Sequence, residues 1–374
     1  MTSVLTQGAD MDEMTIGLFN LATWRDRTLP VESVINGVVE QVEKAELFGF
    51  DVAWFAEHHF SNLCVCPSPL LIASHCAGRT KRIRLGTAVL VLPFYNPMRL
   101  IDEIAYVDIL SGGRLMLGVG TGNQGYEADR LGISMADARV RFIEALDVIE
   151  QSFGGGPISY SGKTIDVPNA LLPLRSSHRP PLPIYLAGLT RDPELMKRCA
   201  ENGYVPFVSG PLLSTEQIAT MRDIYLSAYT AAGKSPARMP FALQRSIYVT
   251  DDRADALDAA ERLRYVQRTI HALHDPQATF DGHHVREAPL AGEDPVEALV
   301  DKAIIGSPEH CIDRLLKDIA ALQPTHLSCA LQFGGLPQMK VLKSMERFAT
   351  EVMPQVRVAG TATLVRRQLS ADAA

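Results

Sequence analysis

Short runs of almost uninterrupted apolar residues alternate along the chain with longer segments in which apolar residues recur every three or four positions. The short runs are typical of parallel strands covered on both faces, and the longer segments are typical of amphipathic helices. Eight strands are predicted, over residues 15–20, 51–58, 83–93, 115–120, 183–188, 204–210, 241–250 and 325–333. The main helices are predicted over residues 30–48, 69–78, 97–110, 136–152, 192–202, 215–233, 252–273, 308–322 and 337–354.

Eight alternating strand–helix units predict an α/β protein with the (β/α)8 fold of a TIM barrel. A doubly wound open sheet is the alternative, but it would usually have fewer strands and a glycine-rich turn after the first one, and "GLFNLATW" has no G-x-G-x-x-G. The rhythm breaks at residues 153–182, which contain "GGG" and "RPPLP" and predict irregular structure with room for a small hairpin.

The connection between the seventh and eighth strands is too long for a simple loop, since it has about 75 residues. Its residues 251–303 are predicted to form an insertion that acts as a lid over the active site. The lid's histidines, of which His283 and His284 are adjacent, are predicted to be surface residues. The predicted organisation is an N-terminal tail at 1–13, a single barrel domain at 14–357 and a C-terminal tail at 358–374.

Composition narrows the class of protein without identifying it. Hydrophobic residues make up 47% and charged residues 21% of the chain, which suits a globular protein with a large core. The net charge is −7, and Lys and Arg form no stripe, so neither nucleic acid nor an anionic membrane is an expected partner. The scattered cysteines without zinc spacing, the absence of a signal-like N-terminus and the absence of a membrane-length apolar run predict a cytoplasmic protein without a metal site.

The stretch "FDVAWFAEHHFS" places an acid and two imidazoles, Glu57, His58 and His59, at the end of the second predicted strand. Active residues of such barrels lie at the carboxyl ends of strands, and these are the only imidazoles at a predicted strand end. Neighbouring side chains on a strand point to opposite faces, so only one of the two can face a site. His58 or His59 is the leading acid/base candidate, and an ordinary pair of rim histidines is the alternative.

Small and hydroxyl-bearing residues follow the fourth, fifth and sixth predicted strands, as in "GVGTGNQG". Thr190 and Arg191 stand just before "DPEL", which opens a predicted helix, and a helix N-terminus attracts phosphate. A plain helix cap is the alternative for Thr190. With no nucleophile elbow and no metal-ligand set, a phosphate-bearing organic cofactor and one histidine are the simpler prediction.

Four stretches carry a resemblance to a known family: "GFDVAWFAEHHF", the block from "LGTAVLVLPFYNP" to "LMLGVGTG", "PIYLAGLT", and "IIGSPEHCIDRLLKDI" with "SMERFATEVMPQV". They resemble the luciferase-like flavin-dependent monooxygenases, of the bacterial luciferase alpha-subunit type. The resemblance implies a homodimeric barrel that uses reduced FMN from a separate flavin reductase. Oxygen would add to the flavin as a C4a-peroxide and oxidise a small hydrophobic substrate such as an aldehyde or ketone.

The resemblance also implies roles for individual residues. His58 would be the catalytic imidazole, and a non-prolyl cis peptide would join Ala88 and Val89 under the flavin ring. The remaining implied cofactor contacts are Ala187 at the ring edge, Arg139, Leu189 and Thr190 at the phosphate, Ser209 as an assisting residue, and Thr121, which stands where luciferases have a phosphate-binding arginine. Two alternatives share the barrel: an F420-dependent hydride-transfer oxidoreductase, and a non-catalytic flavin-binding homologue.

Overall fold

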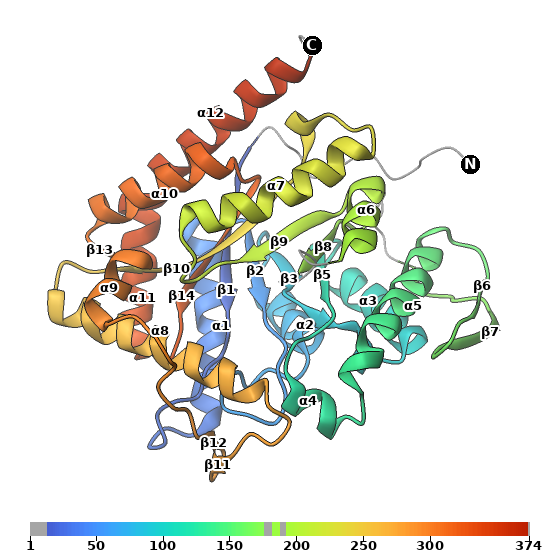
Figure 1. Ribbon diagram of the computed structural model, residues 1–374, viewed down its shortest axis with the longest axis horizontal. Coiled ribbons are helices and arrows are strands. Elements are labelled where there is room, and N and C mark those ends of the chain that lie inside the picture. Colours follow the sequence, from blue (N-terminus) through green and yellow to red (C-terminus); the bar gives the residue numbers. More distant parts are fainter. Residues whose placement is uncertain (1–12, 176–181, 188–191, 373–374) are drawn as a thin grey trace.

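The computed structural model describes residues 13–175, 182–187 and 192–372 (Figure 1). Within them, eight parallel strands close into a barrel in the order β10-β14-β1-β2-β3-β5-β8-β9, and β9 pairs again with β10. The predicted (β/α)8 fold is thereby confirmed. The barrel strands are β1 Thr15–Asn20, β2 Val52–Phe55, β3 Arg84–Thr87, β5 Leu115–Gly120, β8 Ile184–Ala187, β9 Val205–Ser209, β10 Ala242–Val249 and β14 His326–Gln332.

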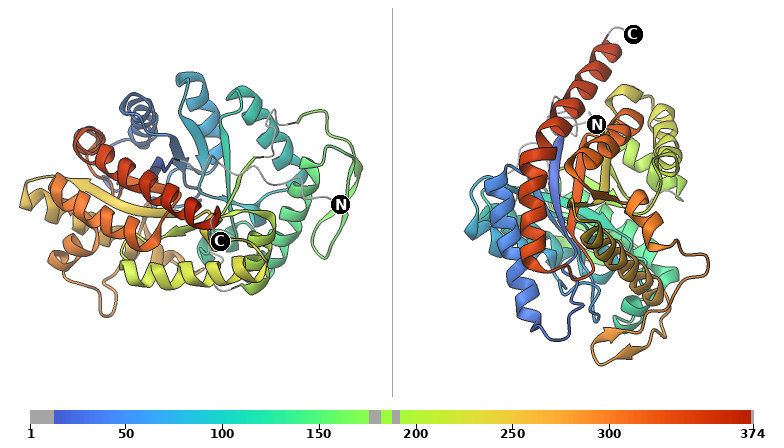
Figure 2. Two further views of the ribbon diagram at one scale, coloured as in Figure 1. Left: turned by 90° about the horizontal axis from the view of Figure 1, so that it is seen from above. Right: turned by 90° about the vertical axis from the view of Figure 1, so that its left-hand side faces the viewer.

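Helices surround the strands, as both views in Figure 2 show. They are α1 Val31–Phe48, α2 Pro69–Arg79, α3 Pro97–Leu110, α5 Met135–Phe153, α6 Pro193–Asn202, α7 Thr215–Ala231, α8 Arg253–Leu273, α10 Pro308–Leu322 and α11 Gln338–Arg347. Several begin where a short polar side chain accepts backbone N–H groups of the first turn, such as Asn96 before α3 and Ser214 before α7. These caps satisfy donors that a helix start leaves free, so the helix boundaries follow local sequence closely. The irregular stretch after α5 contains the hairpin of β6 Ile158–Ser161 and β7 Asp166–Ala170.

A cluster of rings fills the barrel below the carboxyl ends of its strands. The ring centroids of Trp54 and Tyr185 are 4.8 Å apart, and the Tyr185 hydroxyl lies 2.6 Å from Nε2 of His326. Gly86 has no side chain at this level, and a Cβ there would collide with the Trp54 indole. Side chains therefore fill the barrel interior, and a ligand site must lie at the carboxyl ends of the strands.

Burial in the barrel interior lowers the pKa of His326 from 6.5 to about 3. The unfolded chain binds a proton at this residue below pH 6.5 and the folded chain does not, so the free energy of unfolding should fall as pH drops from 6.5 to 3. At about 1.4 kcal/mol per pH unit, the expected loss is about 4–5 kcal/mol over that window. Urea unfolding of wild type and His326→Asn at several pH values isolates this contribution, because the variant lacks the titrating group. An identical pH dependence for both proteins would contradict the prediction.

The long connection between β10 and β14 contains several elements of its own. After α8 come the hairpin β11 Phe280–Asp281 and β12 His284–Val285, the helix α9 Val296–Lys302 and the strand β13 Ile304–Gly306. β13 pairs with the carboxyl-terminal end of β10, over Ile247–Val249, and so extends the sheet beside the barrel. The hairpin lies near α4 (Gly125–Arg130) at one end of the molecule in Figure 1.

The C-terminal region differs from the prediction of a helix ending at residue 354 and a tail at 358–374. A π-helical turn at Phe348–Val352 leads into α12 Met353–Asp372, so Pro354 lies in a continuous helical segment directly after the π turn. Leu364 is buried, and the Arg367 guanidinium donates to the carbonyl oxygens of Ala237, Met239 and Gln323. These contacts attach residues 358–372 to the rest of the barrel as a helix.

Candidate active site

Residues with small side chains gather at the carboxyl ends of four neighbouring strands. Ala88 follows β3, Thr121 follows β5, Ala187 ends β8 and Ser209 ends β9, and these strands are adjacent in the order β3-β5-β8-β9. Ala88, Thr121 and Ala187 are half-buried and Ser209 is exposed. A platform of small side chains at strand ends is a suitable surface for a flat ring. Leu189 and Thr190, which were predicted to contact a phosphate, lie outside the described residues.

The peptide bond between Ala88 and Val89 is cis, which confirms the predicted geometry at this position. The neighbouring strand β5 accommodates the segment through two glycines. A Cβ at Gly118 would collide with the carbonyl oxygen of Thr87, and a Cβ at Gly120 would lie 2.8 Å from Cγ2 of Val89. Thr87 Oγ1 in turn donates to the Gly118 carbonyl at 2.7 Å, so the two backbones are in intimate contact.

His58 and His59 each pair with a different carboxylate. Nδ1 of His58 lies 2.8 Å from Oε1 of Glu127, and Nε2 of His59 lies 2.8 Å from Oε1 of Glu57. Strand β2 ends at Phe55, so the divergence of the two rings comes from these partners and not from strand alternation through residue 58. Both carboxylate side chains are almost fully buried, whereas the His58 side chain is 20% exposed.

The Glu57 carboxylate has a structural role. Its Oε2 accepts from the backbone N–H of Val91 at 3.0 Å and from the Tyr95 hydroxyl at 2.9 Å. Burial and the adjacent Glu57 raise the pKa of Tyr95, which therefore stays a phenol and donates. With both oxygens engaged, Glu57 joins the end of β2 to the segment after the cis peptide and holds His59 in a packed position.

His58 is the imidazole better placed for chemistry. Glu127 engages its Nδ1, and no described residue hydrogen-bonds its Nε2. A ring held at one nitrogen and open at the other can exchange a proton with a ligand. Sequence reasoning did not single out Glu127; the available signal was an acid in "GNQGYEADR", directly after a predicted active-site loop.

Arg139, predicted to contact a phosphate, lies on α5 beside the N-terminus of α6. Its guanidinium forms ion pairs with Asp192, the cap of α6, and with Glu194 at 2.9 Å. Hydrogen bonds to these carboxylates raise the pKa of Arg139, and the hydrogen bond from Arg139 lowers the pKa of Asp192. An anion at this helix end would have to share the guanidinium with two carboxylates or replace one of them.

The hairpin of the long connection is docked against the loops that follow β1 and β2. The backbone N–H of Val285 donates to Oδ1 of Asn62 at 2.9 Å, and the ring centroids of His284 and Trp24 are 4.8 Å apart. His284 is only 6% exposed, so its prediction as a surface residue is wrong. Burial, followed by the charge of Arg27, lowers the pKa of His284 and keeps this docked imidazole neutral at pH 7.

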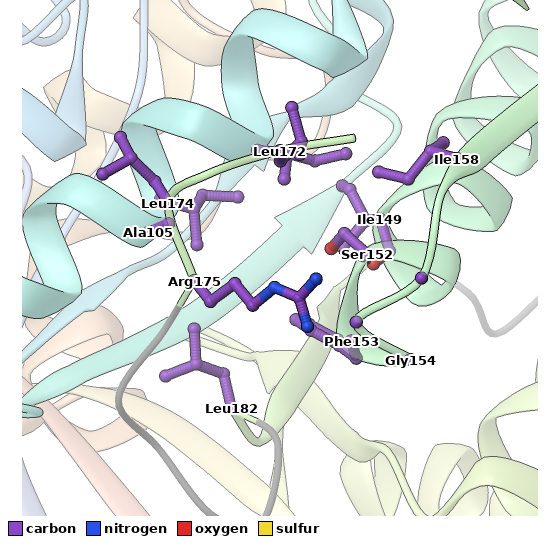
Figure 3. Close-up of a pocket in the computed structure, with 14 residues that line it drawn as sticks. Ala105, Ile149, Ser152, Phe153, Gly154, Ile158, Leu172, Leu174, Arg175 and Leu182 are labelled. Atoms are coloured by element: carbon purple, nitrogen blue, oxygen red, sulfur yellow. Dashed lines mark hydrogen bonds between the residues drawn. The ribbon is translucent and has the colours of Figure 1, made fainter. Parts of the chain in front are cut away.

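A cavity outside the barrel is separate from these residues. It lies between α3, α5 and the chain around residues 154–175, and the Arg175 guanidinium points into it from a largely apolar lining (Figure 3). Leu182, at its edge, precedes β8, so the cavity belongs to the amino end of that strand. Within the described ranges, no cluster of three or more His, Cys, Asp or Glu could hold a metal ion. None of the helices in those ranges is both long and apolar enough to span a bilayer.

A parallel barrel with an imidazole–carboxylate pair and small residues at the carboxyl ends of its strands has the arrangement that is typical of TIM-barrel enzymes. Comparison with known proteins makes this specific. The family model described as "Luciferase-like monooxygenase" matches residues 14–325. The chain therefore belongs to the luciferase-like monooxygenase family, and its enzyme class is flavin-dependent monooxygenase.

Named relatives cover nearly the whole chain. The 4-hydroxyprotoasukamycin monooxygenase of Streptomyces nodosus subsp. asukaensis is 30% identical over 346 residues, which is 90% of this chain and 87% of the relative. The oxygenase component of the flavin-dependent trigonelline monooxygenase of Acinetobacter baylyi is 28% identical over 332 residues, or 86% of this chain and 90% of the relative.

Solved structures share the fold at lower identity. The oxygenating constituent of 3,6-diketocamphane monooxygenase from Pseudomonas putida, in complex with FMN, superposes with a TM-score of 0.71 at 20% identity, covering 91% of this chain and 98% of that one. The coenzyme F420-dependent tetrahydromethanopterin reductase of Methanopyrus kandleri superposes with a TM-score of 0.62 at 18% identity, covering 92% and 99%. Solved structures with this fold thus include one in complex with FMN and one of a reductase that is named as F420-dependent.

Proposed function

We propose that this chain is the oxygenase component of a two-component monooxygenase, which uses FMNH2 from a separate flavin reductase and O2 to oxidise a small hydrophobic substrate such as an aldehyde or ketone. The observation that carries the proposal is the position of His58, whose Nδ1 is held by Glu127 while none of the described residues hydrogen-bonds its Nε2. The ring stands at the strand ends that also carry the cis peptide and the small-residue platform.

The residues present are compatible with FMN. Ala88, Val89, Ala187 and Ser209 would support the ring system, since their side chains are small and at least partly accessible. Arg139 and Thr121, with Leu189 and Thr190, are proposed to hold the phosphate. When bound, reduced FMN would supply the electrons that activate oxygen as a C4a-peroxyflavin.

The protein's own part in the reaction would be to position the cofactor and substrate, to exclude water and to transfer one proton. His58 would donate or accept that proton at Nε2. The docked hairpin, with Trp24 and His284 in contact, would shield the strand ends from bulk water while substrate is bound. Glu57 and Tyr95 would keep the loop that carries His58 in place.

The direct test is anaerobic reduction of FMN, followed by rapid mixing of the protein, FMNH2 and oxygenated buffer with a panel of aliphatic aldehydes and cyclic ketones. The expected results are a transient absorbance of oxygenated flavin and incorporation of one 18O atom from 18O2 into the product. A protein that binds FMNH2 without either result would overturn the proposal.

An F420-dependent hydride transfer is the second candidate, and the shared fold of the F420-dependent reductase favours keeping it. Fluorescence titration with FMN and with F420 separates the two candidates. We expect tighter binding of FMN, and a preference for F420 with substrate-dependent F420 reduction would support the alternative. Binding without turnover in either assay would support a non-catalytic homologue.

We also propose that the chain forms a homodimer through α2 and α3. Their outer faces carry exposed apolar side chains: Leu71, Tyr106, Ile109 and Leu110, each about half exposed or more. Exposed apolar side chains on neighbouring helices are common in protein interfaces. Sedimentation velocity should give twice the chain mass of 40.9 kDa, and Tyr106→Glu should shift the protein toward monomer. A wild-type monomer at micromolar concentration would contradict the dimer.

A cytoplasmic location is proposed as well. All six cysteines are free thiols in the structure, and five of them are buried, which suits a reducing compartment. Localisation of a tagged chain in fractionated cells tests this, and recovery outside the cytoplasmic fraction would contradict it.

A further inference from the structure

The short helix α4 lies between the proposed catalytic imidazole and the long insertion. It begins directly after the loop that follows β5 and extends over Gly125–Arg130. Glu127 points inward, is 2% exposed, and accepts at 2.8 Å from the His58 ring, which comes from 69 positions earlier in the chain. Tyr126 and Arg130 contact the insertion instead, so α4 contacts both His58 and the insertion.

Glu127 decides which ring nitrogen of His58 is available. A buried carboxylate beside Nδ1 favours the tautomer with its proton on Nδ1, which leaves Nε2 as the basic nitrogen. The neighbouring His59 shows the opposite arrangement, with Nε2 engaged by Glu57. Glu127 therefore holds the His58 ring at Nδ1, whereas Glu57 holds the His59 ring at Nε2.

Other titratable groups near His58 are neutral or already engaged. Burial raises the pKa of Cys66 to about 12 and that of Cys64 well above its ordinary value, so both thiols stay protonated. The Cys66 carbonyl oxygen accepts from the His58 backbone N–H at 3.2 Å. Glu57, on the same loop as His58, is bound to His59, Val91 and Tyr95. Glu127 is thus the carboxylate that hydrogen-bonds the His58 ring.

The insertion fixes α4 by two contacts from its outer side. The ring centroids of Tyr126 and Phe280 are 4.7 Å apart, and Nη1 of Arg130 donates to the carbonyl oxygen of Pro276 at 2.8 Å. The Arg130 guanidinium also stacks over the Tyr126 ring at 3.5 Å, so the two side chains brace each other. The hairpin's other side is anchored on Asn62. Docking of the hairpin therefore spans from the loop after β2 to α4.

We propose that Glu127 is the positioning residue of His58, and that docking of residues 274–285 on α4 holds its carboxylate in place. The insertion then has two roles: it covers the site and it completes the imidazole–carboxylate pair. This inference rests on the proposed function for its catalytic meaning, but the pairing itself is testable without flavin or substrate.

The first test is 15N NMR of the full chain labelled at histidine, with the His58 signal assigned by its loss in His58→Gln. In wild type, the neutral His58 ring is expected to carry its proton on Nδ1. In Glu127→Gln, the fraction of the Nδ1–H tautomer should fall, because a neutral side-chain amide can donate to Nδ1 as well as accept from it. Asp129→Asn, which neutralises an exposed carboxylate on the same helix, should leave the His58 signal unchanged.

A proton on Nε2 in wild type, or an unchanged tautomer ratio of His58 in a folded Glu127→Gln protein, would overturn the positioning role. Glu127→Asp is the second variant if Glu127→Gln does not fold; its shorter carboxylate should lower the fraction of the Nδ1–H tautomer by a smaller amount. The double variant Tyr126→Ala/Arg130→Ala tests the insertion. It should also lower the fraction of the Nδ1–H tautomer of His58, and an unchanged fraction would overturn the role of docking.

Turnover provides the catalytic readout. Glu127→Gln should lower kcat by about 10- to 100-fold, with affinity for FMN unchanged within about threefold, and Glu127→Asp should recover part of the lost kcat. Loss of FMN affinity with no change in kcat would indicate a merely structural role. If wild type shows no monooxygenation, the proposed function fails, while the NMR result still decides the pairing.

Discussion

Replacement of His58 by alanine is expected to lower the kcat of substrate oxygenation by about 10²- to 10⁴-fold, the usual contribution of one general acid or base. The physical reason is the loss of the one imidazole at the strand ends whose Nε2 is open, among the described residues. Affinity for FMN should change little, because the small residues of β3, β5, β8 and β9 form the proposed platform. Single-turnover rates with FMNH2, O2 and substrate measure this directly.

His59→Gln is the matched control for His58→Ala. It alters the adjacent imidazole on the same loop, and its amide N–H can still donate to Glu57. Its kcat should stay within about tenfold of wild type, since His59 packs rather than reacts. If His58→Ala retains wild-type turnover, or if His59→Gln proves the more damaging change, the assignment of His58 is wrong.

Gly118→Ala is expected to destabilise the fold by about 1–3 kcal/mol, the usual cost of overpacking, and to abolish tight binding of FMN. The added methyl group would collide with the carbonyl oxygen of Thr87, which is backbone and cannot rotate away. To relieve the collision, the segment with the Ala88–Val89 peptide must shift, and that segment forms part of the platform. Urea unfolding and fluorescence titration with FMN measure the two effects.

Gly78→Ala is the control for the same chemical change in open space. Gly78 lies in α2, and no atom lies within 4 Å of the position that its Cβ would take. Because alanine favours a helix over glycine, this variant should be neutral or more stable by up to about 1 kcal/mol, with FMN binding unchanged. A Gly118→Ala protein with wild-type stability and FMN affinity would show that the two backbones can separate at no cost.

The elements of the fold were predictable because their signals are local. Continuous apolar runs such as "LMLGVG" predict covered parallel strands, and cap residues such as Asn96 and Ser214 stand at the observed helix starts. The C-terminal helix was missed at Pro354, since a proline within a predicted helix usually ends it. Here a π-helical turn comes first, and packing of Leu364 and Arg367 stabilises a further helix.

The sequence by itself determined the barrel, the strand end that carries His58 and His59, and, through the family resemblance, the position of the cis peptide. Only the tertiary structure decided which carboxylate each ring meets, and that Arg139 is shared with Asp192 and Glu194. The reason is the range of the interactions. Strands and caps are encoded within a few neighbouring residues, whereas the pairing of His58 with Glu127 exists only after barrel closure brings the ends of β2 and β5 to the same rim.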